Sequence, residues 1–283
     1  MANCKHCSKP AGFLRKKHAD CEAQYQEHQR LIENGCTQII ALSAIAIKNM
    51  GSLDDLTKKI SEIEQTLSVP TQNRKALLIK SWENAVEDFL VDGILDKDEE
   101  NKLMEFKEYF ALSQDDVNKN GSLTKTTKAA VIRDILNGEV PQRFSIDGSL
   151  SINFQKDEKI VWAFPNSKYL EDKTRKQYVG GSKGVSVKIA KGFYYRTGSF
   201  KGHAVERIER VHIDTGWVIL TSKNIYFAGS QKSLRLPYKK IVSFEPYSDG
   251  MGIMRDAATA KTQVFVTGDG WFTYNAVINL AQL

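Results

Sequence analysis

The sequence predicts an α+β protein of several modules. A small zinc module and a helical bundle come first, followed by a mostly antiparallel β-domain that ends in a helix. Three observations carry this prediction. The first 21 residues hold four metal-ligand residues, residues 53–136 repeat apolar side chains at helical spacing, and residues 149–266 alternate apolar and polar side chains. With 283 residues and 41% hydrophobic content, the chain can build modules with cores of their own.

We expect five segments along the chain. They are a zinc-binding knuckle and helix (1–35), a helical connector (36–70), a helical domain (71–140), a β-hairpin with a basic linker (141–182) and a β-domain (183–283). The net charge of +6 is unevenly spread, with +3 in residues 1–50, −5 in residues 51–137 and +8 in residues 138–283. An acidic middle between basic ends indicates modules with different surfaces.

The zinc prediction depends on Cys4-x2-Cys7 followed by His18-x2-Cys21. Three thiols and one imidazole are ligands that suit a single tetrahedral Zn²⁺. So short a segment cannot bury a core, and a bound metal would supply its folding free energy. Four protein ligands leave no open position for water, so we expect a structural rather than a catalytic zinc ion. The alternative to a purely structural role is a recognition module.

Helices are expected to follow the knuckle directly. Residues 14–33 contain neither proline nor glycine, and Gly35 is expected to end this helix. A second helix is expected over residues 37–50, ending at Gly51. In a third, Ser52 is an N-cap, and apolar residues recur at helical spacing to Leu67. These apolar stripes predict packing surfaces, with an interaction helix or an oligomer seam as the alternative.

The helical domain is expected to begin at Pro70. An amphipathic helix runs to the Asp92-Gly93 turn, and Asp96 with Glu99 predicts a capping box for the next helix. A last helix is expected from about Thr126 to Leu136.

This order of helix, Asp-Gly turn and helix resembles the TerB-like helical domains of bacterial tellurite-resistance and phage-response proteins. The resemblance covers residues 74–137 and implies a second, divalent metal held by acidic residues near the turn. The carriers here would be Asp92, Asp96, Glu99 and Glu100. Helix capping explains the same acids without a metal, so both interpretations stay open.

Eleven short runs with alternating polarity predict strands between residues 149 and 266, and a final helix is expected over residues 272–280. The stretch 216–227, the strand 241–245 and the aromatic helix start 270–274 resemble the pleckstrin-homology and GRAM superfold. This resemblance covers residues 185–283 and implies a bent antiparallel sheet closed by a C-terminal helix. Residues 144–164 are expected to form an attached hairpin outside that core.

A basic stretch with a glycine-rich turn runs through residues 173–201. Backbone N–H groups in such turns can bind phosphate. In the resembled family, basic residues around the first hairpin bind anionic headgroups or acidic peptides. By position these are Lys183, Lys188, Lys191 and Arg196. An ordinary solvated strand edge is the alternative, and tyrosines interleaved with bases could also stack on nucleic acid.

Catalysis finds little support in the sequence, because no nucleophile motif is present. A hydrolase would require Asp249, Asp256, Asp269 and His212 to converge in one cleft. The predicted function is therefore a non-enzymatic adaptor that binds a membrane surface or an acidic protein, in a bacterial stress or phage response. A zinc-dependent nucleic-acid-binding protein is the alternative, and homo-oligomers are open. We expect a cytoplasmic location, because no signal sequence or long apolar run is visible and three cysteines fall in a metal pattern.

Overall fold

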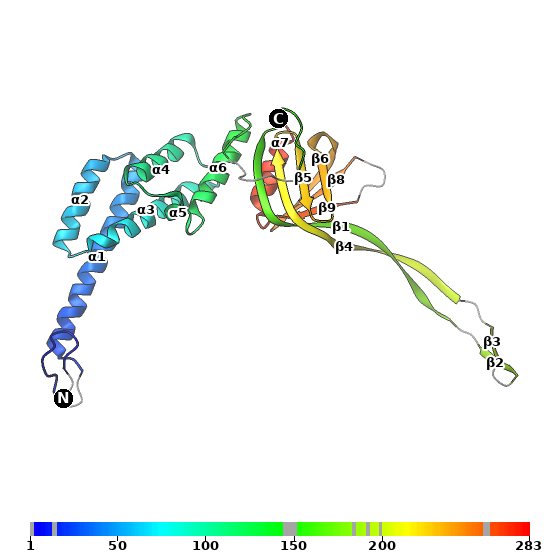
Figure 1. Cartoon of the computed structure of the whole chain (residues 1–283), viewed down its shortest axis with the longest axis horizontal. Helices are drawn as coiled ribbons and strands as arrows, with labels where there is room; N and C mark the ends of the chain where they lie inside the picture. Colours follow the sequence, from blue (N-terminus) through cyan, green and yellow to red (C-terminus); the bar gives the residue numbers. More distant parts are fainter. Residues whose placement is uncertain are drawn as a thin grey trace. The chain divides into compact units, whose positions relative to one another are not determined.

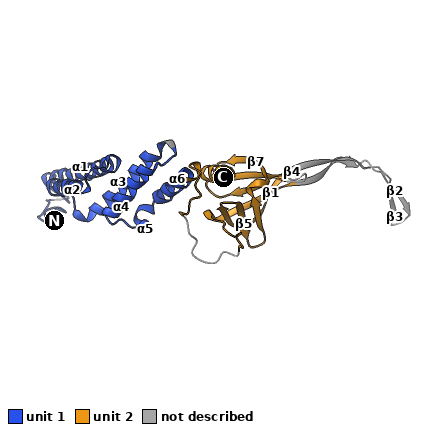
Figure 2. Cartoon of the chain, turned by 90° about the horizontal axis from the view of Figure 1, so that it is seen from above, with its two compact units in different colours: residues 1–133 blue, residues 134–283 orange. Residues whose placement is uncertain are grey.

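The computed structural model describes residues 3–12, 16–143, 152–182, 185–190, 193–197, 200–256 and 261–283. Side chains are described for these residues except Asp92 and residues 174–208. The chain divides into two compact units, Met1–Arg133 and Asp134–Leu283 (Figure 2). The first is helical and the second is built on an antiparallel sheet, which confirms the predicted α+β class.

The helical unit contains six α-helices and two short 3-10 turns among its described residues. They are α1 (Ala19–Asn49), α2 (Leu53–Thr66), η1 (Thr71–Asn73), α3 (Arg74–Phe89), η2 (Leu90–Asp92), α4 (Lys97–Tyr109), α5 (Gln114–Asn118) and α6 (Ser122–Leu136). The predicted caps are confirmed. The Ser52 side chain accepts a hydrogen bond from the backbone N–H of Asp55, and Asp96 forms a complete capping box with Glu99.

The prediction that Gly35 ends the first helix was wrong. Helix α1 runs for 31 residues without interruption, and Gly35 is buried in its interior (Figure 1). A Cβ at this position would lie 2.4 Å from Cγ2 of Val69 and 3.1 Å from Cβ of Leu67. The glycine therefore provides room for the segment after α2 to pack on α1. Its cost in helix propensity, about 1 kcal/mol, is offset by that close packing.

One apolar core joins the helices on both sides of residue 70. Ile39 of α1, Ile60 of α2 and Trp82 of α3 are fully buried in it, together with Leu103 and Phe106 of α4. The Trp82 indole N–H donates a 2.9 Å hydrogen bond to the backbone carbonyl of Leu103, so the largest core side chain also satisfies its polar atom. The segments expected as connector and helical domain thus share a single core.

Helix α1 is also long and apolar enough to cross a membrane by length and composition alone, although Ser43 and other polar residues interrupt its apolar run. Core helices of soluble proteins pass the same test. In α1 22% of the most apolar window is buried, and the buried side chains of this helix include Ile39, Ser43 and Ile47.

The second unit is a seven-stranded antiparallel sheet followed by helix α7 (Gly270–Leu280). Its strands are β1 (Ile160–Ser182), β4 (Phe200–Thr221), β5 (Asn224–Gly229), β6 (Ser233–Pro237), β7 (Ile241–Tyr247), β8 (Gly250–Arg255) and β9 (Gln263–Val266), in the order β6-β5-β4-β1-β9-β8-β7. Strands β2 (Val185–Ala190) and β3 (Phe193–Thr197) pair separately. Asp269 caps α7 by accepting from the N–H of Phe272, whose ring packs on Trp162 of β1.

The expected boundary at residue 182 and the expected separate hairpin over residues 144–164 were wrong. Strand β1 is the middle strand of the sheet and pairs with both β4 and β9. Residues 152–159 form no strand, and residues 144–151 lie outside the described residues. The partners of β1 stand about 20 to 100 residues later in the chain, so alternation within residues 144–164 could not reveal them.

Strands β1 and β4 pair with each other beyond the point where the rest of the sheet ends. Strand β9 reaches β1 only over Lys168–Glu171, whereas the pairing of β1 with β4 continues in register to Ser182 and Phe200. Residues 173–182 and 200–209 therefore make a two-stranded ribbon. At its base the Arg210 guanidinium pairs with Asp172 at 3.0 Å and lies 5.1 Å from the ring centroid of Tyr247.

Candidate metal centre

The four predicted ligands come together at the start of α1. Cys4 and Cys7 lie in a tight turn, in which the N–H of Cys4 donates to the Lys9 carbonyl at 2.7 Å and the N–H of Ser8 donates to the Cys4 carbonyl at 2.9 Å. His18 is the N-cap residue of α1, and Cys21 lies in its first turn. The sequence therefore places two ligands on a turn and two on a helix start, as predicted.

The ligand atoms of Cys4, Cys7, His18 and Cys21 all lie within 4.8 Å of one another. His18 Nδ1 is 3.4 Å from the sulfur of Cys7 and 3.7 Å from that of Cys21. Tetrahedral sites hold their ligand atoms at this kind of mutual separation, because each lies about 2.0–2.3 Å from the metal. This group could hold a metal ion, and it is the one such group among the residues whose side chains are described.

The orientation of His18 fits a metal ligand. Its Nε2 lies 3.0 Å from the backbone carbonyl of Pro10, to which it can donate a hydrogen bond. A protonated Nε2 leaves the lone pair on Nδ1, which is the nitrogen that faces the cysteines. Contacts with Cys7 and then with Pro10 raise the pKa of His18.

The close packing of the thiols gives Cys4 and Cys21 different pKa values. Burial raises the pKa of the Cys4 thiol, but hydrogen bonds from the backbone of His6, His18 and Cys7 outweigh burial and lower that pKa to about 6. A hydrogen bond with Cys7, together with burial, raises the pKa of the Cys21 thiol to about 11. Three thiolates so close together repel one another, and a divalent cation between them removes this conflict.

A second set of contacts ties the knuckle to α1, and the sequence did not reveal it. The Glu22 carboxylate lies 2.8 Å from His6 Nε2 and 2.7 Å from the Lys17 ammonium group. The Lys17 and His6 contacts, in that order, lower the pKa of Glu22 to about 2. The His6 ring stacks on Tyr25 with 4.6 Å between ring centroids. His6 is thus a neighbour of the site, as expected. The sequence feature that could have indicated a role for Glu22 is its position next to the ligand Cys21.

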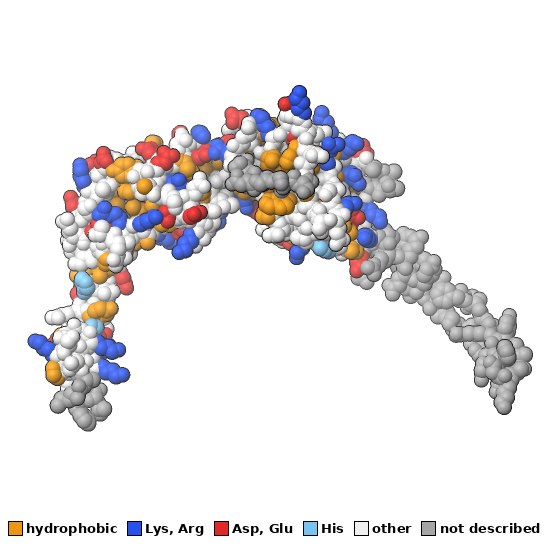
Figure 3. Space-filling model, in the orientation of Figure 1, with side chains coloured by type: hydrophobic (Ala, Val, Ile, Leu, Met, Phe, Trp, Pro, Cys, Tyr) orange, Lys and Arg blue, Asp and Glu red, His pale blue; other side chains and the backbone are white. Residues whose placement is uncertain are grey.

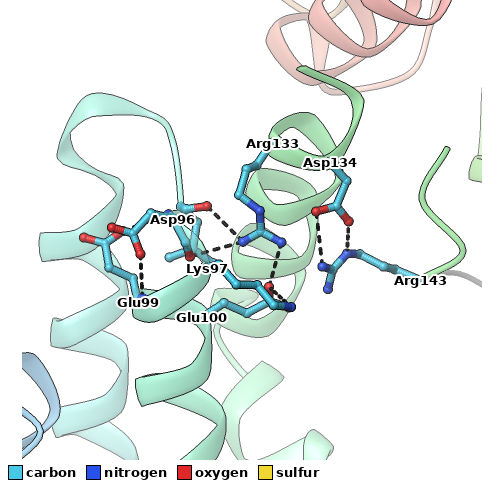
Figure 4. A network of polar contacts seen from close by, with 8 residues as sticks. Asp96, Lys97, Glu99, Glu100, Arg133, Asp134 and Arg143 are labelled. Atoms are coloured by element: carbon cyan, nitrogen blue, oxygen red, sulfur yellow. Dashed lines mark hydrogen bonds and ion pairs between the residues drawn. The ribbon is translucent and has the colours of Figure 1, made fainter. Parts of the chain in front are cut away.

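The acidic turn carries other contacts at the positions expected for a second metal. Asp96 and Glu99 cap α4, while the buried Glu100 carboxylate pairs with Arg133 at 2.8 Å and with Lys97 at 3.3 Å (Figure 4). Arg133 also donates to the carbonyls of Leu95 and Asp96, each at 3.1 Å. The cation that contacts this turn is therefore the guanidinium group of Arg133. The side chain of Asp92 lies outside the described residues.

Of the four predicted anion-binding residues, the structure describes the backbone of Lys188 and Arg196. Lys183 and Lys191 lie outside the described residues. Lys188 lies in β2 opposite Tyr194, and Arg196 lies in β3 opposite Ser186, with their side chains outside the described part. The backbone thus joins these two positions in one small antiparallel pair.

Of the groups named for a hydrolase, His212 and Asp269 use their side chains in local contacts, and Asp249 and Asp256 make backbone hydrogen bonds. His212 Nε2 lies 3.0 Å from the Thr215 hydroxyl, and Asp269 caps α7. The carbonyl of Asp249 accepts from the backbone N–H groups of Thr267 and Gly268, and the N–H of Asp256 donates to the Lys240 carbonyl.

Comparisons of this chain with protein-family models, with curated proteins and with solved structures give no match. The metal centre therefore stands on its own geometry.

Proposed function

We propose that this chain is a non-enzymatic adaptor in which a zinc-bound knuckle and the basic stretch of residues 173–210 bind an anionic partner. A closed site of three thiolates and one imidazole suits Zn²⁺ best. Cys4, Cys7, His18 and Cys21 would hold it, and the ion would supply structural rather than catalytic chemistry. The spacing of the ligand atoms and the hydrogen bond from His18 to Pro10 support this assignment.

The distribution of charge carries the proposal. Residues 1–19 contain five basic and no acidic side chains, and residues 173–210 contain ten basic and two acidic ones. We call the second stretch the basic segment. The remaining residues contain 25 basic and 32 acidic side chains, so the chain is acidic outside these two stretches. Figure 3 shows lysine and arginine side chains gathered around the knuckle at the start of α1. Charge collected in this way favours binding to a negatively charged partner.

The first candidate partner is an anionic membrane surface or an acidic protein. Two basic regions in one chain can combine weak contacts into a stronger one. The TerB-like resemblance of residues 74–137 and the pleckstrin-homology and GRAM-like resemblance of residues 185–283 support an adaptor in a bacterial stress or phage response. In such an adaptor the basic segment supplies the binding site, and Lys183, Lys188, Lys191 and Arg196 are its central residues.

The second candidate partner is nucleic acid, and the ribbon favours it. Strands β1 and β4 pair over ten residues each outside the rest of the sheet, and the basic segment contains this ribbon. At about 3.3 Å per residue the ribbon is about 33 Å long, close to one turn of duplex DNA. The major groove admits a two-stranded β-ribbon, and phosphates line both of its sides.

Binding assays at two salt concentrations test the proposal. The zinc-loaded chain is mixed with vesicles containing phosphatidylserine, with a polyglutamate peptide and with single- and double-stranded oligonucleotides, at 50 and 200 mM salt. We expect retention on at least one of these polyanions at low salt. Oligonucleotide binding that falls steeply with salt identifies nucleic acid, since each neutralised phosphate adds about 0.9 to the logarithmic slope for duplex DNA.

A matched pair of variants locates the site. Replacing Lys183, Lys188, Lys191 and Arg196 by glutamine should weaken binding at least tenfold. The control replaces Lys156, Lys223, Lys239 and Lys240, which lie outside the basic segment, and should bind like the parent chain. Equal loss in both variants, or no retention on any polyanion, contradicts the proposal and makes an uncharged protein surface the leading partner.

A further inference from the structure

The two pairs of metal ligands are joined by a contact that uses none of the ligand atoms. Cys4 and Cys7 belong to the knuckle, whereas His18 and Cys21 belong to the start of α1, and ten residues separate the two pairs. A metal ion must bring the pairs together, which costs the entropy of closing this loop. A contact that already joins the two pairs lowers that cost and so strengthens metal binding.

The contact is made by the Glu22 carboxylate and the His6 imidazole. His6 stands between the two knuckle ligands in the sequence, and Glu22 stands next to the helix ligand Cys21. Each ligand pair therefore contributes one partner. Glu22 Oε2 lies 2.8 Å from His6 Nε2, and the two side chains are 22% and 21% exposed. About four-fifths of each side chain is thus covered where the knuckle meets the helix.

Neighbouring side chains fix both partners of this contact. Glu22 Oε1 accepts from the Lys17 ammonium group at 2.7 Å and from the Gln26 amide at 3.0 Å, which leaves Oε2 for the imidazole. Tyr25 lies three residues after Glu22, on the same side of the helix. Its ring stacks on that of His6 with 4.6 Å between the centroids. The carboxylate and the imidazole are therefore each held by more than one neighbour.

His6 acts outside the ligand group. The four residues whose ligand atoms lie close together include His18 and not His6. A carboxylate can only accept, so His6 Nε2 carries the proton of the bond to Glu22 and has no lone pair for a metal. We propose that Glu22 is a positioning residue, which through His6 holds the knuckle in the arrangement that binds zinc. This proposal rests on the zinc assignment of the proposed function.

The charge of Glu22 by itself would have the opposite effect. A Zn²⁺ ion with three thiolates and a neutral imidazole carries a net negative charge. A nearby carboxylate repels such a complex, so loss of the charge alone would leave zinc affinity unchanged or increase it. A variant with weaker zinc binding therefore reports the lost contact with His6.

Zinc affinity of the full chain, measured by competition with a chromogenic chelator, tests the proposal. Glu22→Ala should weaken zinc binding about tenfold, at the lower end of the effect of outer-shell partners. Glu22→Gln loses the same charge but can still accept from His6, and should keep most of the affinity. The matched control, Asp20→Ala, removes the other acid of the first turn of α1 and should bind zinc like the parent chain. Equal urea midpoints show that the variants fold.

A double-variant cycle tests whether Glu22 acts through His6. His6→Phe keeps a ring against Tyr25 but removes the donor, and should weaken zinc binding about as much as Glu22→Ala. In that background Glu22→Ala should cause no further loss, because the contact is already absent. Fully additive losses, or a Glu22→Ala chain that binds zinc like its parent, overturn this proposal alone. A parent chain that binds no zinc overturns the zinc assignment as well.

Discussion

The two ends of helix α1 are held in different ways. At its start, residues 23–28 are all exposed, and the helix is tied to the knuckle by His18, Cys21 and the Glu22 contacts. Toward its end, Ile39 and Ile47 are buried in the core of the helical unit. One continuous helix thus passes from a region organised by polar and metal-ligand atoms to one organised by apolar burial. A short knuckle cannot exclude water by burial, so its order depends on a few strong contacts.

Metal removal should have the largest effect and should act on one end only. Chelation, or Cys7→Ser, would remove the proposed zinc ion, and ions in structural zinc sites bind with an apparent free energy of about 10–16 kcal/mol. We expect amide protection to disappear over residues 3–34, because a short exposed helix is marginal in water. Protection over residues 74–106 should persist. Hydrogen exchange with mass spectrometry measures both regions.

The fourth cysteine provides the control. Cys36→Ser leaves the four ligands intact and should retain one zinc ion per chain by elemental analysis. Full protection of residues 3–34 in the metal-free chain would show that side-chain contacts alone hold the knuckle.

Breaking the buried ion pair should have the largest effect at the core end. Arg133→Ala leaves the Glu100 carboxylate buried and removes the donor to two backbone carbonyls. Loss of one partner of a buried pair costs about 3–5 kcal/mol. Urea unfolding followed by circular dichroism measures the change. Lys97→Ala is the control, since an exposed partner of the same carboxylate contributes about 0–1 kcal/mol; equal losses would contradict the distinction.

Gly35 lies in α1 between its exposed start and its buried end. Adding a methyl group at this position tests how tightly the buried end is packed. Gly35→Ala gains about 1 kcal/mol of helix propensity and loses about 1–3 kcal/mol by overpacking against Val69. We expect a net loss of about 1 kcal/mol in the free energy of unfolding. In a Val69→Ala background the same change should be neutral or stabilising. A stabilising effect of Gly35→Ala alone would mean that the packing gives way freely.

The smallest expected effect concerns pH. The Lys75 ammonium group, followed by Ser113, lowers the pKa of Asp116 from 3.8 to about 2. A depressed pKa in the folded state stabilises the protein above pH 4, and this contribution is lost as the pH falls from about 4 to about 2. Asp116→Asn should therefore reduce the pH dependence of the urea midpoint in this window. An unchanged dependence would assign the acid sensitivity to other carboxylates.

Local chemistry explains what the sequence alone determined. The caps at Ser52 and Asp96 were readable because their partners stand three residues away: the N–H of Asp55 donates to Ser52, and Glu99 completes the capping box of Asp96. The spacing of Cys4, Cys7, His18 and Cys21 was readable for a similar reason, since two pairs of nearby ligands need only one turn and one helix start to meet.

Tertiary structure decided whatever depends on distant partners. Whether Gly35 ends a helix or lies inside one and packs against Val69 depends on a contact between residues 34 positions apart. The central place of β1 depends on β4 and β9, and the cation at the acidic turn is Arg133, more than 30 residues further along the chain. Sequence periodicity records which face of an element is apolar, but not which element covers that face. Which elements cover each other is decided by tertiary packing, because it depends on contacts between segments that are far apart in the sequence.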